Sequence, residues 1–82
     1  MIEADVYAGL TRVFRDVLDN ETLTIGPTSN PADVPGWDSM AFVNLVVGTE
    51  AEFSVEFTTA EIDGIKRVGD LAALILAKKR QA

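Results

Sequence analysis

All three prolines of this chain lie in one stretch, residues 19–37, which separates two segments of helical periodicity. The stretch reads DNETLTIGPTSNPADVPGW and contains a Gly-Pro and a Pro-Gly pair. Proline fixes φ and removes a backbone donor, so both helix interiors and central strands are disfavoured here. The sequence therefore predicts a long loop. Because long loops in small domains are usually functional or ordered by their own side chains, we expect Leu23, Ile25 and Val34 to pack against a core.

The segment before this loop has the three- and four-residue spacing of an amphipathic helix, which we predict over about residues 2–18. The segment after it, SMAFVNLVVGTEAEF, contains β-branched residues that a buried strand would accept, but it is long for a strand. Its stripe of Met40, Val43, Val47 and Glu50 has helical spacing, so we predict a second helix here. Apolar positions of the first helix are Val6, Leu10, Val13, Phe14 and Val17.

Two further helices are predicted towards the end of the chain. Thr58 and Glu61 have the spacing of a capping box, which would open a short helix through about residue 65. A last helix begins near Val68, and the basic run KKR at 78–80 suits the negative end of its dipole. The predicted fold is all-α: one domain, residues 1–82, with three main helices, one short helix and a long loop between the first two.

Composition excludes several kinds of chemistry. The chain has no cysteine, so disulfides, structural zinc and thiolate catalysis are ruled out. It has no histidine, which removes the usual base of a serine hydrolase and the commonest metal ligand. At 82 residues there is also little room for a water-free active site. We expect neither a metal nor catalysis by this chain alone.

Charge indicates the kind of partner. Thirteen acidic against seven basic residues give a net charge of -6, which argues against nucleic acid or an anionic membrane and favours basic protein surfaces. The start, MIEADVY, is acidic and leads into no long apolar run, so we expect no signal peptide and no membrane span. We expect a cytoplasmic monomer.

The stretch GWDSM at residues 36–40 is the candidate functional motif. It places Ser39 directly after Asp38 at the start of the second predicted helix. A serine or aspartate in such a place is most often a helix cap. Taken alone, the motif leaves two interpretations open: a cap, or a hydroxyl presented for modification.

The surroundings of this motif resemble the acyl carrier proteins, in which Gly-x-Asp-Ser-Leu begins the second helix. Here GWDSM is followed by Val43-Asn44-Leu45 in the register of that family. EAEF at 50–53, EF at 56–57 and IKRVGDL at 65–71 continue the likeness without gaps to about residue 75. A register kept over half the chain is far more specific than the pentapeptide.

The resemblance implies that Ser39 is the attachment point of 4'-phosphopantetheine, transferred from coenzyme A by a separate phosphopantetheinyl transferase. Asp38 would help to present Ser39. The thiol of the arm would hold acyl or aminoacyl groups as thioesters, which explains how a chain without cysteine could handle them. Further implied partners are an acyl- or aminoacyl-loading ligase or transferase and downstream biosynthetic enzymes, with this chain a carrier and not an enzyme.

One departure from the family pattern concerns docking. The second helix of fatty acid carriers usually has an acidic outer face, whereas Ala41, Asn44, Gly48 and Ala51 are small and neutral here. This favours dedicated partners in a specialised pathway over fatty acid synthesis. The predicted partner-docking residues are Met40, Asn44, Glu50 and Glu52.

Some packing questions stay open in the sequence. Trp37, next to a Pro-Gly turn, could shield the base of the arm or touch a partner, but we favour a structural role in which it pins the loop to the core. Gly48 in mid-helix costs about 1 kcal/mol relative to alanine, so a packing or a docking reason is expected. A space for the acyl chain between helices is a second use for residues that otherwise form core. It would be bordered by Phe42, Val43, Val47, Phe53, Phe57, Ile62 and Ile65.

Two other functions are compatible with the sequence. The first is a helical interaction module that never carries the cofactor, with Ser39 only a cap. The second is a hydrolase with Ser39 as nucleophile, which ranks last because the chain offers no base for it.

Overall fold

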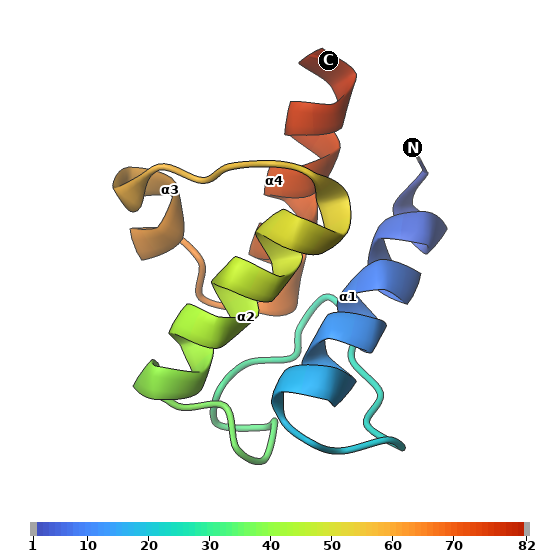
Figure 1. Cartoon of the computed structure of the whole chain (residues 1–82), viewed down its shortest axis with the longest axis vertical. Coiled ribbons are helices and arrows are strands. Elements are labelled where there is room, and N and C mark those ends of the chain that lie inside the picture. Colours follow the sequence, from blue (N-terminus) through green and yellow to red (C-terminus); the bar gives the residue numbers. More distant parts are fainter. Residues whose placement is uncertain (1, 82) are drawn as a thin grey trace.

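The computed structural model describes residues 2–81, which form four helices and no strand. The helices are α1 (Glu3–Val17), α2 (Ser39–Phe53), the short α3 (Thr59–Asp63) and α4 (Val68–Gln81). Figure 1 shows α1, α2 and α4 around a common interior, with α3 to one side. The beginning of α2 lies at the opposite end of the molecule from the beginning of α1 and the end of α4. The all-α prediction, with a long loop between the first two helices, is confirmed.

The first helix follows the predicted periodicity within one residue at each end. Its buried face is Val6, Gly9, Leu10, Val13 and Phe14. Acidic residues stand in its first turn and Arg15 in its last, an arrangement that complements the helix dipole. The helix is thus specified locally by charge and by spacing.

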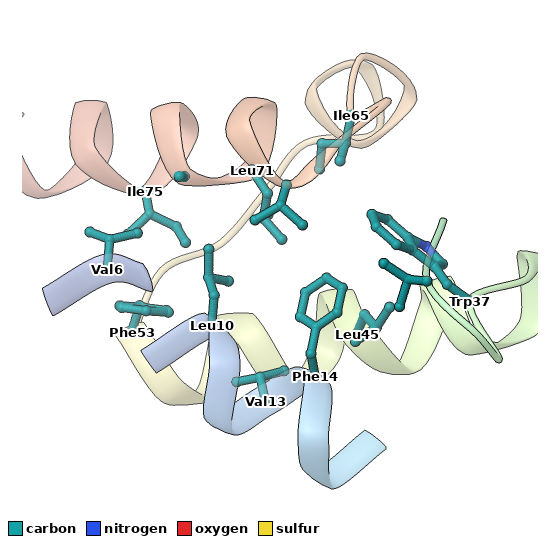
Figure 2. Packing of buried hydrophobic residues seen from close by; sticks show 13 residues of the cluster. Val6, Leu10, Val13, Phe14, Trp37, Leu45, Phe53, Ile65, Leu71 and Ile75 are labelled. Atoms are coloured by element: carbon teal, nitrogen blue, oxygen red, sulfur yellow. The ribbon is translucent and has the colours of Figure 1, made fainter. Parts of the chain in front are cut away.

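The core joins α1, α2 and α4 with two residues of the loop (Figure 2). Leu10 and Phe14 of α1, Leu45 of α2, and Leu71 and Ile75 of α4 are almost completely buried. Each such side chain contributes about 1.5–3 kcal/mol relative to remaining exposed. These contacts fix the position of α2, and therefore of its first residue, against the other two long helices.

The long loop is packed, as predicted. Val34 is buried, while Leu23 and Ile25 are partly buried against the core. The loop also satisfies the start of α4: Val68 N–H donates to Ser29 O and Gly69 N–H to Pro27 O, both at 2.9 Å. These two donors belong to the first turn of α4, which has no carbonyl of its own to offer them.

Gly48 has a packing reason. A Cβ at this position would lie 3.0 Å from Val13 Cγ1, so the glycine allows α1 and α2 to approach closely. Gly48 therefore faces α1, and it does not belong to the outer face of α2 with which the sequence grouped it. The choice between packing and docking is decided in favour of packing.

The helix α2 is apolar on two faces. Leu45, Val46, Thr49 and Phe53 are buried. On the other side Met40, Val43 and Val47 are exposed, at 81%, 61% and 59%. The predicted stripe is therefore helical but points to solvent, and Val43 and Val47 do not line a space between helices.

A capping box opens α3 as predicted. The Thr58 hydroxyl accepts the Glu61 N–H at 3.1 Å, and Glu61 Oε1 accepts the Thr58 N–H at 2.8 Å. The helix ends at Asp63, two residues before the predicted end, and Ile65 then enters the core. Lys78 Nζ of α4 lies 2.9 Å from Glu61 Oε1 and so ties this short helix to α4.

Candidate functional site

At the start of α2, Asp38 caps the helix and Ser39 presents an exposed hydroxyl. Asp38 is the N-cap, with extended backbone, and its Oδ1 accepts the Ala41 N–H at 2.8 Å. Ser39 is the first helical residue and is exposed. Within the residues described, its hydroxyl makes no hydrogen bond. The cap is therefore Asp38, which removes the interpretation that Ser39 serves as a cap.

Gly36 and Trp37 place this pair. Gly36 has φ of +86°, a region that glycine enters at little cost, and so the chain can turn sharply out of the loop. Trp37 is only 5% exposed, and its ring meets Phe14 edge-on with 5.1 Å between centroids and 82° between planes. The predicted structural role of Trp37 is confirmed: it anchors the entrance of α2 to α1.

A pocket of about 310 Å³ opens beside Ser39. Its lining comes from the loop, the first turn of α2 and the segment before α4: Pro31, Trp37, Asp38, Ser39, Phe42 and Ile65. Among these lining residues Asp38 is the sole titratable one, and its carboxylate is engaged with the Ala41 N–H. Apart from this carboxylate, the lining holds no group that could act as a base.

The predicted docking residues fall into two groups. Met40 and Asn44 are exposed in the first turns of α2, near Ser39. Glu50 is half-buried, and its Oε2 accepts the Phe57 N–H at 2.8 Å. Glu52 Oε2 lies 3.0 Å from the Arg12 guanidinium. The two glutamates thus stand near the other end of the helix and are occupied within the chain.

Some residues of this region were missed by the sequence analysis. Val43 and Val47 extend the exposed face that starts with Met40. Their spacing was visible, but the spacing does not say which of two apolar faces is buried. Pro31 was missed as a lining residue of the pocket, whereas Phe42 and Ile65, which the sequence analysis placed at the border of a space for the acyl chain, do line it.

Glu61 and Tyr7 have pKa values that differ from their usual ones. The Thr58 backbone N–H, and then Lys78, lower the pKa of Glu61 below its usual value. Burial, with a smaller contribution from Glu3, raises the pKa of Tyr7. Glu61 lies at the contact between α3 and α4, and Tyr7 lies in α1. Neither side chain lines the pocket beside Ser39.

Comparison with known proteins identifies the family. The family described as phosphopantetheine attachment site matches residues 8–75, most of the chain. The chain is also 34% identical over 79 residues to the acyl carrier protein MbtL of Mycolicibacterium paratuberculosis, covering 96% of this chain and 89% of the relative. It belongs to the acyl carrier protein family. The predicted resemblance is confirmed.

More distant carriers and a solved structure agree with this assignment. The meromycolate extension acyl carrier protein of Mycolicibacterium smegmatis is 27% identical over 73 residues, which cover 89% of this chain and 74% of that protein. The solution structure of the holo acyl carrier protein from Geobacter metallireducens superposes with a TM-score of 0.82 at 33% identity. The match covers 93% of this chain and 91% of that one.

Family membership establishes the general activity. This acyl carrier protein is a carrier and not an enzyme, with 4'-phosphopantetheine as its covalent cofactor. A phosphopantetheinyl transferase and biosynthetic enzymes are its general partners. None of the helices that the structure describes is long and apolar enough to cross a membrane.

Proposed function

We propose that Ser39 carries the phosphopantetheine and that the arm presents acyl or aminoacyl thioesters to dedicated enzymes of a specialised pathway, with fatty acid synthesis the second choice. One observation carries the assignment of the residue: Ser39 is the exposed first residue of α2, while Asp38 takes the cap. The hydroxyl is therefore held at a defined place and is free to react.

The transfer forms a bond between Ser39 Oγ and the phosphorus that bears the pantetheine. It breaks the pyrophosphate bond of coenzyme A and releases adenosine 3',5'-bisphosphate. The hydroxyl proton passes to a base of the transferase, because the one carboxylate in the pocket lining, that of Asp38, serves as the helix cap. The resulting phosphodiester anion stands at the positive end of α2, where the N–H groups of Ser39 and Met40 have no carbonyl within the helix.

Asp38 presents Ser39 in this proposal. Its bond to Ala41 N–H holds the first turn of α2, and so the backbone of Ser39 keeps one position relative to the helix. An amide side chain can make the same bond without the charge, which separates the capping role from an electrostatic role towards the transferase.

Partner enzymes dock along the exposed face of α2 in this proposal. The face begins with Met40 beside Ser39, contains Asn44, and is extended by Val43 and Val47. It carries no charge over these turns, so apolar contact has to supply most of the affinity. Glu50 and Glu52 form the rim of this face, where a basic partner residue would improve encounter without adding much affinity.

A neutral, apolar docking face supports a dedicated set of partners because it discriminates against enzymes whose docking sites are basic. Relatives include an acyl carrier protein named for meromycolate extension. We propose that this chain likewise serves one biosynthetic route, as a cytoplasmic monomer loaded by its own acyl or aminoacyl ligase or transferase.

Intact mass tests the attachment site. The protein is incubated with coenzyme A, magnesium and a promiscuous phosphopantetheinyl transferase, next to Ser39→Ala and Ser54→Ala. Ser54 is a matched control, since it is an exposed serine at the other end of the same helix. We expect one phosphopantetheinyl addition to the wild type and to Ser54→Ala, and none to Ser39→Ala. If the folded wild type stays unmodified, even with a transferase from its own source, an interaction module becomes the better explanation.

A further inference from the structure

The pocket beside Ser39 is the feature that the attachment reaction itself does not use. We infer that it seats the geminal dimethyl group of the phosphopantetheine arm, so that the holo protein keeps the first part of its arm against Trp37. This inference rests on the proposed attachment at Ser39. It assigns a resting place to one chemical segment of the arm, a branched, saturated hydrocarbon.

The lining determines what the pocket can accept. Trp37, Phe42 and Ile65 provide apolar walls, and Pro31 closes the side towards the loop. No lysine or arginine is among the lining residues, and the single charge is the carboxylate of Asp38. An anion such as the phosphate is therefore disfavoured inside the pocket, whereas an uncharged hydrocarbon gains from leaving water.

The covalent structure of the arm determines which of its apolar groups can reach the pocket. Ser39 itself stands in the lining, and only the phosphate and one methylene separate its oxygen from the quaternary carbon that bears the two methyl groups. Beyond that carbon the arm carries a hydroxyl and two amides, for which the apolar walls have no partners. With about 310 Å³ the pocket is at the lower end of the range for ligand sites, which suits one short segment and not the whole arm.

The walls are fixed before any arm is present. Trp37 is held edge-on by Phe14, and Ile65 N–H donates to Ile62 O at 3.1 Å. The bond from Val68 N–H to Ser29 O keeps the loop, and with it Pro31, against the segment that contains Ile65. Figure 2 shows Trp37 and Ile65 on the same side of the core. A preformed pocket costs little ordering when it is filled.

The seat has to be weak enough for delivery. Two buried methyl groups favour the seated arm over the free one by roughly 15-fold at most. A partner enzyme that binds the distal arm can therefore withdraw it, because it has to overcome only this small preference. The bound position would reduce the number of conformations that the arm adopts in the free carrier, and it would still allow the thioester to reach a partner enzyme.

Trp37 is the sole tryptophan of the chain and reports on its own pocket. The wild type is loaded from coenzyme A and, in parallel, from an analogue in which both methyl groups are replaced by hydrogens. Intact mass confirms that each load is complete. Because Trp37 is already only 5% exposed, we expect a small decrease in acrylamide quenching with the natural arm and none with the analogue. Equal quenching of the two fully loaded proteins overturns the inference while the attachment at Ser39 stands.

Two neighbouring variants provide the control. Phe42→Ala removes a wall, whereas Val43→Ala changes the next residue, which is exposed and does not line the pocket. Nuclear Overhauser contacts between the arm methyls and Trp37 are expected in the holo wild type and in Val43→Ala, and are weakened in Phe42→Ala. If shielding of Trp37 appears only after loading from hexanoyl coenzyme A, the pocket holds the acyl chain and the assignment to the arm is wrong. A protein that takes up no arm at all removes both the proposed function and this inference.

Discussion

Trp37 and Phe14 meet edge-on, with 5.1 Å between their ring centroids. One ring comes from the last residues of the loop and the other from α1, so this contact joins the entrance of α2 to the first helix. Because Ser39 follows Trp37 by two residues, the position of Ser39 depends on this aromatic pair.

Replacement of Trp37 by alanine should lower the free energy of unfolding by about 3–5 kcal/mol, as for other large buried side chains. Trp37→Phe should lose clearly less, since it keeps an aromatic ring against Phe14. Urea titration followed by circular dichroism measures both. A loss below about 1 kcal/mol for the alanine variant would contradict the anchoring role.

Asp38→Ala should cost about 1 kcal/mol of stability, because the Ala41 N–H loses its acceptor. Asp38→Asn keeps an oxygen in the same place and should keep most of that stability. The rate of phosphopantetheine transfer then tells whether the charge matters beyond the cap. Equal melting temperatures for all three proteins would show that the carboxylate does not hold the helix.

Gly48→Ala should fail to stabilise α2, although alanine is the better helix former by about 1 kcal/mol. The added Cβ would lie 3.0 Å from Val13 Cγ1, which is tighter than ordinary contact. In a Val13→Ala background the same change should gain stability, because the obstructing methyl is gone. A double-mutant cycle from chemical denaturation measures this coupling. Additive effects would mean that Gly48 is not a contact point.

Val47→Asp should slow turnover of the loaded carrier by its own partner enzyme by about fivefold or more, because a charge would be buried in an apolar interface. Stability should hardly change, since Val47 is 59% exposed. Ala4→Asp adds the same charge to an exposed position of α1 and should have little effect. Wild-type turnover should also depend weakly on salt; a steep salt dependence would indicate docking through charges instead.

The contact between Glu61 and its neighbours should make stability depend on acid. The Thr58 backbone N–H, and then Lys78, hold the pKa of Glu61 below the usual 4.5. The ionised form is thus favoured in the folded state, so its contribution is present above pH 4.5 and is lost as the pH falls through the folded value. Glu61→Gln should lower the urea midpoint at pH 7 and have a shrinking effect below pH 4.5. A constant difference at all pH values would exclude this linkage.

Local structure was predictable from the sequence because it depends on neighbours along the chain. Proline at 27, 31 and 35 limits φ and removes donors, which determined the loop. Thr58 and Glu61 stand three residues apart, the separation at which a side chain reaches a backbone N–H in the first helical turn, and both bonds form. The family, and with it the carrier function, followed from a register of residues over half the chain.

The tertiary structure determined which face of each helix is buried, a question that the spacing of apolar residues leaves open. The helix α2 is apolar on two sides, and only its packing against α1 and α4 shows that Leu45 is inside and Val43 outside. The same packing turns Gly48 towards α1 and brings Ile65 to the pocket beside Ser39. Burial is a property of contacts between distant segments, whereas helical periodicity is a property of one segment, so the sequence alone determined the helices and the tertiary structure chose their faces.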